Sequence, residues 1–541
     1  MYIIQERFNA KEFPGNVRQI CDSILSNGVG GDVNETDREV IHETVYAIDG
    51  NTTMVCDDAI GYDEATSMVQ VHITDVARVF GNNIDNVAVK EALQRCTSVY
   101  GAIYEESMFP EEFSTRVLSL TGDRHDGTAI TTQFGIDENG DLRPDSFKVY
   151  LTRLENVSKL TYAEGDTMIH SGGNVLAKLC EMAELRGKRR REIGEVKDIR
   201  QSEVEIRAVR MEGNANTWQI SFDDVPSTGS TEMVAELMIS ANYVFCAMMD
   251  YWRVPIPYRC QDNFHYPDED MILELSPHYR YRAFRHAKAA QYSLYGYGHC
   301  GLGLDMYCTM TSPARKSVDL FCQFQFKVGV LKDTVFDDEY VENVMDSYAD
   351  MNRKVKSFIK EQRRMLTLTH FKDNPGLQVE CIFMKSVPWL MAVKIDEGEV
   401  CMNAQVKATK YDFDMNVYIR VDDNARKMVF PCMFKVEVQG LDEVEKSVIA
   451  KPVRLSGPPI MTITAETYTD DTSAPSDSNT DSLDSDPSSG IVYEALSTPP
   501  SSEEGDVSVY KTGNTTWAPT GSVQGVGGVR QSARLLGKNR K

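Results

Sequence analysis

The spacing of apolar residues changes along the 541-residue chain, and this change limits the folds that the chain can adopt. From about Thr44 to about Val330, alternating runs such as MVQVHITDV stand among apolar helical runs such as MVAELMISANYVFCAMMDYW. Alternation with a period of two is typical of a strand, whereas spacing by three and four is typical of a helix. The mixture predicts one large α+β domain, with Val69, Val71 and Ile73 on one face of a strand.

A second pattern begins near Asp337, where apolar residues recur at intervals of three and four as far as Ile359. It predicts an amphipathic helix with a basic C-terminal half. About five β-like runs follow between Leu377 and Gln439. Five short strands fit a small closed barrel such as an OB-fold, which often binds single strands. A small β-sandwich that serves only packing is the alternative.

The C-terminal region is strongly biased in composition. Residues 465–510 contain no Lys or Arg and are rich in Asp, Glu, Ser, Thr and Pro. Such a segment cannot bury enough apolar surface to fold, so we predict a disordered acidic tail. The final stretch GGVRQSARLLGKNRK carries only positive charge. The net charge of −24 therefore says little about the folded part and does not exclude a nucleic-acid partner.

Two classes of protein are disfavoured by composition. No uninterrupted apolar run is long enough to span a membrane, and the N-terminus MYIIQERFNAKEF soon meets charge. We therefore expect a soluble, cytoplasmic protein without a membrane partner. The 12 cysteines form no C-x-x-C pair and no Cys/His spacing of a zinc site. They are predicted to be reduced thiols, mainly in the core.

Three carboxylates are crowded in the stretch VYAIDGNTTMVCDDAIGYDE, namely Asp49, Asp57 and Asp58. A strand ending in Asp49, followed after a turn by the other two, can point all three into one concave site. Carboxylate oxygens suit hard cations such as magnesium, and two such ions can clamp the oxygens of a phosphodiester. Asp-Asp pairs also occur in solvated turns and at helix caps, so spacing alone leaves both interpretations open.

Eight sequence blocks decide between these interpretations. In order they are AIDGNTTMVCDDAIGY, VHITDVARVFGNNIDNVA, RCTSVY, SMFPEEFSTRVLSL, SKLTYAEGD, LRGKRRREIGEV, VAELMISANYVFCA and GHCGLGLDMYCTMTSPARKSVDL. Together, from about residue 38 to about residue 330, they resemble the RNB catalytic domain of the ribonuclease II and ribonuclease R exoribonucleases. The predicted helix and barrel fall where that family places a helical linker and an RNA-binding OB barrel. The family's N-terminal pair of cold-shock barrels has no counterpart in the residues before the first block.

The resemblance implies both an activity and a division of the chain. The implied activity is hydrolysis of single-stranded RNA from the 3′ end to nucleoside 5′-monophosphates, with magnesium, or alternatively manganese, as cofactor. The implied segments are a short N-terminal segment (1–40), the RNB catalytic domain (41–330), a linker helix (331–366), an OB-like barrel (367–455) and a disordered acidic then basic tail (456–541).

Specific roles follow from the resemblance, residue by residue. Asp49 and Asp58 are expected to ligate magnesium, and Asp57 to hold the metal and the attacking water in reactive geometry. Arg315, in TSPARKS, is expected to contact the phosphate near the scissile bond, where negative charge grows in the transition state. Tyr100 is expected to stack on a base at the RNA 3′ end.

Further residues have weaker assignments. Ser312 and Pro313 are expected to shape the turn that presents Arg315, and Tyr162 and Glu236 to line the base-stacking channel. Both Tyr100 and Tyr162 also suit ordinary core packing, in a chain with 24 tyrosines. The run RGKRRR (186–191) is most simply a solvated helix face, or else part of a basic route for the RNA backbone. His72 is expected to be a packed or hydrogen-bonded histidine.

The chain departs from the family pattern in its first block. The family normally carries a fourth Asp two residues before the Asp-Asp pair, and this chain has Val55 there. Two hypotheses therefore remain: a magnesium-dependent 3′ to 5′ exoribonuclease, or an RNB pseudo-nuclease that binds RNA as a regulator without efficient cleavage. The unusual tail adds the hypothesis of a protein partner recruited through it.

Overall fold

The computed structural model describes most of the chain before residue 465. The described residues are 12–29, 38–194, 203–210, 218–225, 227–262, 288–330, 335–386, 393–396, 399–408, 413–422, 427–442 and 447–464. The predicted acidic and basic stretches of the tail lie outside the described residues.

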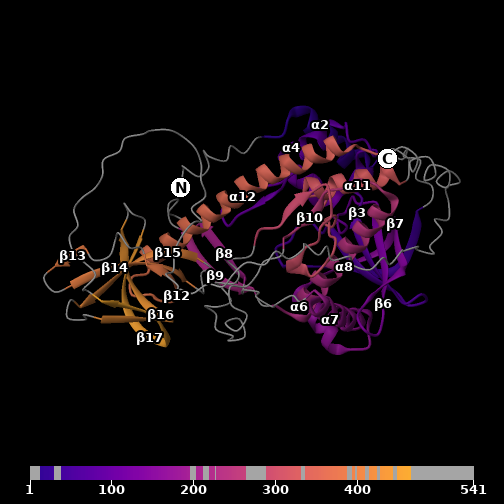
Figure 1. Cartoon of the computed structure of the whole chain (residues 1–541). Coiled ribbons are helices and arrows are strands. Elements are labelled where there is room, and N and C mark those ends of the chain that lie inside the picture. The colour runs from indigo at the N-terminus through magenta and orange to yellow at the C-terminus, as the bar shows by residue number, and fades with distance from the viewer. Residues whose placement is uncertain are drawn as a thin grey trace, which may run out of the picture.

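A closed five-stranded barrel organises the first part of the molecule, with strand order β1-β2-β3-β6-β7 (Figure 1). Its neighbours run antiparallel except β1 and β7, whose parallel pairing closes the barrel. The strands are β1 (Glu39–Asp49), β2 (Asp58–Asp63), β3 (Met68–Thr74), β6 (Thr128–Ile136) and β7 (Leu142–Thr161). The alternating run predicted as a strand is β3.

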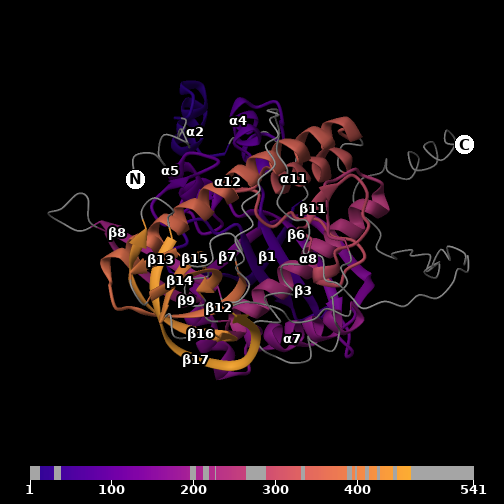
Figure 2. The ribbon, with the colours of Figure 1, turned by 60° about the vertical axis from the view of Figure 1, so that its left-hand side comes forward.

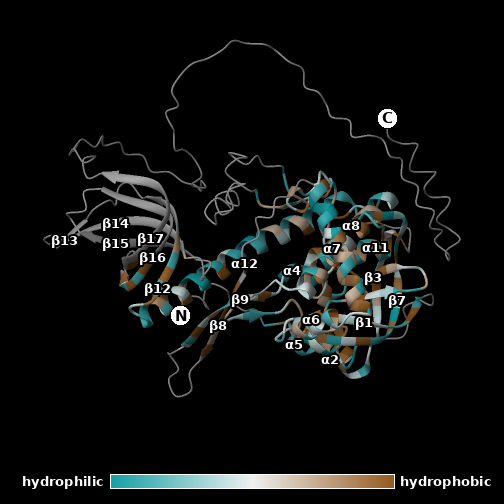
Figure 3. Ribbon diagram, turned by 90° about the horizontal axis from the view of Figure 1, so that it is seen from below, coloured by the Kyte–Doolittle hydropathy of each residue, from teal (hydrophilic) through white to brown (hydrophobic). Residues whose placement is uncertain are grey.

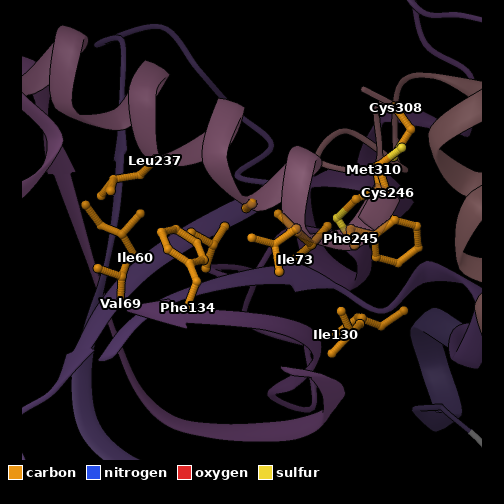
Figure 4. Close-up of a cluster of buried hydrophobic side chains, with 14 of the residues drawn as sticks. Ile60, Val69, Ile73, Ile130, Phe134, Leu237, Phe245, Cys246, Cys308 and Met310 are labelled. Carbon is orange, nitrogen blue, oxygen red and sulfur yellow. The ribbon is translucent and has the colours of Figure 1, made fainter. Parts of the chain in front are cut away.

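Three helices cover one side of this barrel: α6 (Tyr162–Ser171), α7 (Val175–Ile193) and α8 (Gly229–Trp252). Each begins where a polar side chain caps the free backbone N–H groups of the first turn, from Thr161, Asn174 and Thr228 respectively. Figure 4 shows Leu237 and Phe245 of α8 directed toward the apolar face of the strands. Val69, Val71 and Ile73 lie on that face and are fully buried, as predicted.

Helix α8 is the one element of the described chain that is long and apolar enough to cross a membrane. Length and composition alone support that reading, and 67% of its apolar window is buried inside the molecule. Burial of this extent is what a core helix shows, so the membrane signal is weak.

Shorter elements complete this first part. They are α2 (Gly15–Asn27), α3 (Val76–Val79), α4 (Val87–Arg95), β4 (Val99–Tyr100), β5 (Glu105–Glu106), α5 (Glu111–Phe113), η1 (Ser114–Leu118), β8 (Glu203–Arg210), β9 (Trp218–Val225), β10 (Tyr258–Cys260), β11 (Gln291–Ser293), η2 (Cys300–Leu302) and α11 (Ser317–Gly329).

The predicted amphipathic helix is α12, which runs from Asp338 to Asp373 and so passes the predicted boundary at residue 366. Its apolar stripe includes Val341, Met345 and Val355, all buried, as the spacing indicated. Figure 2 shows α12 crossing the front of the molecule, and teal, hydrophilic residues recur along it in Figure 3. The helix therefore links the barrel domain to the strands that follow.

Six strands follow α12, one more than the sequence predicted. They are β12 (Gln378–Ser386), β13 (Val393–Asp396), β14 (Glu399–Ala408), β15 (Phe413–Asp422), β16 (Lys427–Asp442) and β17 (Ser447–Thr464). The additional strand is β17, and the predicted start of the tail at residue 456 falls inside it. Pro452, Pro458 and Pro459 lie in β17, and proline is disfavoured in strand interiors, which explains the missed strand.

The pairing of these strands forms a ring. The order is β12-β16-β17-β15-β14-β13, and an additional pairing joins β12 to β14. The β15–β17 pairing is parallel, whereas the others are antiparallel.

The β8–β9 hairpin belongs by sequence to the first part but packs against the last. Its Val204 and Phe222 share a buried cluster with Phe371 of α12 and with Val379 and Val436 of the C-terminal strands. The Phe222 ring also meets the His370 ring edge to face, with centroids 5.1 Å apart. Figures 1 and 3 show the hairpin reaching toward those strands beneath α12.

His72 of β3 is fully buried, and its Nδ1 lies 2.8 Å from Thr131 Oγ1. The prediction of a packed, hydrogen-bonded histidine is confirmed. Burial lowers the pKa of His72 from 6.5 to about 3, because the charged ring would lose its hydration.

We expect acid to destabilise the fold through His72. Between pH 6.5 and pH 3 the unfolded chain binds a proton at this ring that the folded chain does not, so stability falls as pH falls. Between pH 7 and pH 4.5, the free energy of unfolding of the wild type should fall by roughly 2 kcal/mol more than that of His72→Gln. Urea unfolding at a series of pH values measures this loss. Parallel stability curves for the two proteins would contradict the expectation.

Candidate active site

A cavity of about 1000 Å³ opens where strands β1 and β2 meet the hairpin β8–β9 and helix α12. Five of the seven residues predicted to form the site line it: Asp49, Asp57, Asp58, Tyr100 and Arg315. Val55 also lines this cavity, and it is half-buried against the neighbouring apolar cluster. The structure therefore brings the crowded carboxylates and the distant TSPARKS arginine together.

The barrel strands fix the backbone of the three carboxylates. Asp49 ends β1, where it is paired with Thr161 of β7, and Asp58 begins β2 opposite Ile73. Between them, the Asp57 carbonyl accepts a hydrogen bond from the Thr74 N–H at 2.9 Å. The acidic residues are thus held by barrel hydrogen bonds rather than by a solvated turn.

Asp57 and Arg315 form the centre of the arrangement. The Asp57 carboxylate accepts hydrogen bonds from the Ala314 N–H at 2.9 Å and from Arg315 Nε at 3.2 Å. The Asp57 side chain is 2% exposed and that of Arg315 is 41% exposed. Burial raises the pKa of Asp57 to about 6, although the Arg315 charge and the Ala314 N–H oppose the rise.

Asp58 and Asp49 contribute further negative charge. Burial and then the charges of Asp49 and Asp57 raise the pKa of Asp58 to about 8. Burial also raises the pKa of Asp49, although a hydrogen bond with Cys56 and the charge of Arg315 act to lower it. Crowded, partly desolvated carboxylates of this kind are stabilised by a cation.

The chemistry of these side chains suits a hard divalent cation, since all three offer carboxylate oxygens. In the described part of the chain, the Asp58 carboxylate has no hydrogen-bond partner that would compete with such an ion. Among the described residues, however, no group of three or more His, Cys, Asp or Glu side chains is arranged as a complete metal site. Magnesium binding therefore stays a prediction.

Two buried side chains to which the sequence assigned no role hold the Arg315 loop. The Asp319 carboxylate accepts hydrogen bonds from the Ser312 N–H at 2.9 Å and from Thr309 Oγ1 at 2.7 Å. From the other side, Asn242 Oδ1 of α8 accepts the Met310 N–H at 2.8 Å. Both residues lie within sequence blocks that resemble the RNB family, and this resemblance was the one signal by which they could have been found.

We expect Asp319→Ala to lower activity by misplacing the loop. The change leaves the Ser312 N–H and the Thr309 hydroxyl without partners, so Ala314 and Arg315 lose their fixed position beside Asp57. RNA cleavage, the activity that the resemblance implies, should fall about a hundredfold in rate with a small change in RNA affinity. Asp319→Asn, which retains one acceptor oxygen, should recover part of that rate. Equal losses in both variants, or a loss confined to RNA affinity, would contradict a positioning role.

Tyr100 extends from the segment that is bonded to the Arg315 loop. The Arg315 carbonyl accepts the Ser98 N–H at 3.0 Å and the Thr97 hydroxyl at 3.2 Å. Tyr100 follows in β4, and it is 51% exposed. Its exposure in the cavity argues against core packing and leaves the ring available for stacking.

Neither Tyr162 nor Glu236 lines the cavity. Tyr162 starts α6 beside the carboxylates; burial, then the charges of Asp49 and Asp58, raise its pKa to about 12. Glu236 of α8 is buried and accepts two hydrogen bonds from Arg190, at 2.8 and 2.7 Å. Its carboxylate is therefore already engaged within the fold.

The RGKRRR run of α7 is structural in large part. Arg186 and Arg190 are each 6% exposed, and Arg189 pairs with Asp141 of the barrel domain at 3.1 Å. The expectation of a solvated helix face is wrong for Arg186 and Arg190, because α8 supplies a buried carboxylate that the sequence pattern could not reveal.

Sequence comparison identifies relatives of this chain. Residues 38–331 match the family model of the RNB domain. An uncharacterized ribonuclease of Synechocystis is 26% identical over 374 residues, which cover 67% of this chain and 54% of the relative. Ribonuclease R of Chlamydia pneumoniae is 26% identical over 363 residues, which cover 59% of this chain and 51% of the relative. The chain thus spans about half the length of these curated relatives.

Structural comparison finds the same fold in solved proteins. The apo form of Mycoplasma genitalium RNase R aligns with a TM-score of 0.67 at 16% identity, covering 84% of this chain and 77% of the other. The same enzyme in complex with ribose-methylated single-stranded RNA aligns with a TM-score of 0.63 at 15% identity, covering 84% of this chain and 75% of the other. Yeast Ssd1, a pseudonuclease, aligns with a TM-score of 0.53 at 15% identity, covering 77% of this chain and 53% of the other.

Proposed function

This chain belongs to the RNB domain family, and on that premise we propose that it hydrolyses single-stranded RNA stepwise from the 3′ end to nucleoside 5′-monophosphates. The observation that carries the proposal is the pairing of Asp57 with Arg315 at the cavity that Asp49, Asp58 and Tyr100 also line. These side chains come from three separate sequence blocks, and a coincidence of ordinary surface residues would not gather them in one cavity.

We propose that Asp49 and Asp58 hold magnesium, or alternatively manganese, together with Asp57. Each carboxylate oxygen can accept more than one hydrogen bond, so Asp57 keeps capacity beyond its bonds to Ala314 and Arg315. A divalent cation bound there would lower the pKa of a coordinated water molecule and would neutralise negative charge on the phosphate.

The chain's own residues supply position and charge. Arg315 has its Nε anchored on Asp57, and its 41% exposed side chain can present the remaining N–H groups to a phosphate oxygen. Tyr100 offers a ring face to the terminal base, which places the scissile phosphodiester against the carboxylates. The Ala314 N–H and the buried Asp319 keep this geometry fixed before RNA binds.

The ring of strands after α12 is proposed to be an OB-type barrel that binds RNA. Its five ring members are β12, β14, β15, β17 and β16, in the order that pairs each with the next. A closed five-stranded arrangement is characteristic of that fold, which commonly binds oligonucleotides. Single-stranded RNA is the proposed partner, and a protein partner is proposed for the tail beyond residue 465.

The proposed function is tested with purified protein and a 5′-labelled single-stranded RNA, in magnesium and separately in manganese. Stepwise shortening from the 3′ end with release of nucleoside 5′-monophosphates is the expected result. RNA with a blocked 3′ end is the control and should stay intact. Tight RNA binding without shortening in either metal would overturn the proposal.

The second candidate function is an RNA-binding pseudo-nuclease, and Val55 favours it. Val55 lines the cavity two residues before Asp57, at the position where the family pattern has another acidic residue. A valine gives a cation no ligand, so one acidic ligand expected from that pattern is absent.

We expect Val55→Asp to increase cleavage at low magnesium. The new carboxylate would add an oxygen ligand at the cavity wall, and the magnesium concentration for half-maximal rate should fall at least about threefold. Val55→Asn, which adds an amide of similar size without the charge, is the matched control and should have the smaller effect. A magnesium requirement that stays unchanged would show that Val55 does not limit metal binding.

A further inference from the structure

The cavity is acidic for a site that receives RNA. Eight acidic and four basic side chains line it, and no lysine does so among the described residues. Phosphate chains are usually bound by unpaired Lys and Arg, because release of counterions drives that binding. The way in which these four arginines are paired therefore decides how a strand can be held.

All four guanidinium groups contact other groups of the protein, and they differ in how much of each side chain stays exposed. Arg95 is 9% exposed and pairs with Glu91 at 2.8 Å and Glu106 at 2.6 Å. Arg207 pairs with Glu205 at 2.8 Å, beside the cavity on β8.

Arg363 of α12 donates to the Val204 carbonyl at 3.0 Å, which ties it to the base of the hairpin. Asp57 contacts Arg315 at its Nε, and the Arg315 side chain is 41% exposed, whereas that of Arg207 is 57% exposed. Among the described lining residues, Arg315 and Arg207 are thus the two guanidinium groups best placed to meet a phosphate, and Arg315 is the one held against a carboxylate of the site.

The cavity instead exposes apolar side chains. Met54 is 65% exposed, Val209 is 64% exposed and Tyr100 is 51% exposed, and all three line this one cavity. Met54 lies in the turn that connects Asp49 to Asp57, whereas Val209 lies on the β8 wall. Apolar side chains left in water on separate elements of one cavity suit a ligand with flat apolar faces.

We propose that Met54 and Val209 are nucleobase contacts, and that this cavity holds single-stranded RNA mainly by its bases rather than by its phosphates. The inference rests on the proposed function and names two residues that determine how the substrate is recognised. Every nucleobase has an apolar face, so contact with Met54, Val209 and Tyr100 tolerates any sequence. Phosphates near the carboxylates would be repelled except where Arg315 or a cation compensates.

The first test uses a labelled 2′-O-methylated pentauridylate, which resists cleavage, and the full chain at fixed magnesium. An otherwise identical strand of abasic units has the same phosphates without bases. Binding through bases predicts at least about tenfold weaker affinity for the abasic strand. It also predicts a slope of log affinity against log salt shallower than about −2, since at most about two guanidinium groups, those of Arg315 and Arg207, are placed to contact phosphate. Equal affinity for both strands, or a slope steeper than about −4, would overturn the inference.

The second test changes the side chains. Met54→Ser and Val209→Ser should each weaken pentauridylate binding about fivefold and leave the salt slope unchanged. Ile193→Ser is the matched control, because Ile193 is 57% exposed on α7 but does not line the cavity. Unchanged affinity in both cavity variants would overturn the inference. The fluorescence-monitored melting temperature of each variant establishes that it is folded.

Failure of this inference and failure of the proposed function are distinguishable. An enzyme that shortens RNA but binds the abasic strand equally well keeps its function and loses the base contacts. A protein that prefers bases but never shortens RNA keeps the base contacts and loses the enzymatic function. Preference for a basic peptide over pentauridylate, in direct competition, would overturn the assignment of RNA to this cavity.

Discussion

Asp57→Asn will reduce RNA cleavage at least about a thousandfold while leaving RNA affinity within about threefold of the wild type. The Asp57 carboxylate holds the Arg315 guanidinium and accepts the Ala314 N–H, and it is almost completely buried. An asparagine keeps the shape but removes the charge, so both the arginine and any bound cation lose an anionic partner. The loss should appear in the rate of the chemical step.

Single-turnover shortening of 5′-labelled RNA measures that rate, and fluorescence anisotropy of the same RNA measures affinity. Asp63→Asn is the matched control, because Asp63 ends β2 but accepts hydrogen bonds from Ala65 and Thr66 in a surface turn. It should cleave at close to the wild-type rate. Residual activity in Asp57→Asn within tenfold of the wild type would refute the central role given to Asp57.

Asp75→Ala should have the largest effect on stability, lowering the free energy of unfolding by about 3–5 kcal/mol. Asp75 is fully buried and lies 2.5 Å from both Lys327 Nζ and Arg38 Nη2. Burial acts to raise the pKa of Asp75, but Lys327 and Arg38 outweigh it and hold the pKa to about 2. Alanine would leave two cations in the interior without this carboxylate, and it would also remove the N-cap of α3.

Chemical unfolding at neutral pH measures this change. The exposed pair of Lys90 and Asp85, 2.8 Å apart, is the control, and Asp85→Ala should cost less than about 1 kcal/mol. A similar loss for both variants would mean that burial of the Asp75 pair adds no stability. Because Asp75 lies outside the cavity lining, RNA affinity of the folded variant should stay near that of the wild type.

The local parts of the site were predictable from sequence, because they depend on residues near one another in the chain. Asp49, Asp57 and Asp58 belong to one block, and the strand and turn pattern already placed them together. Arg315 was found through resemblance alone, since no local pattern connects it with residues more than two hundred positions earlier. Its pairing with Asp57 supports the value of matching ordered blocks.

The parts that sequence reasoning missed depend on long-range packing. The Arg190–Glu236 pair and the Asp319 contacts require knowledge of which helix faces which loop. Strand β17 was hidden by its prolines, and the placement of the β8–β9 hairpin follows from contacts with strands far along the chain. Periodicity predicts that a segment is a strand or a helix, but it does not name its partner.

The β8–β9 hairpin has a consequence for how such a protein can change over evolutionary time. Its Val204 and Phe222 complete a core whose other members come from α12 and the C-terminal strands, while the same hairpin forms a wall of the cavity. The C-terminal strands are therefore not an exchangeable module. Recombination that replaced them would uncover the apolar face of the hairpin and disturb the cavity wall at once, so the two parts are expected to be inherited together.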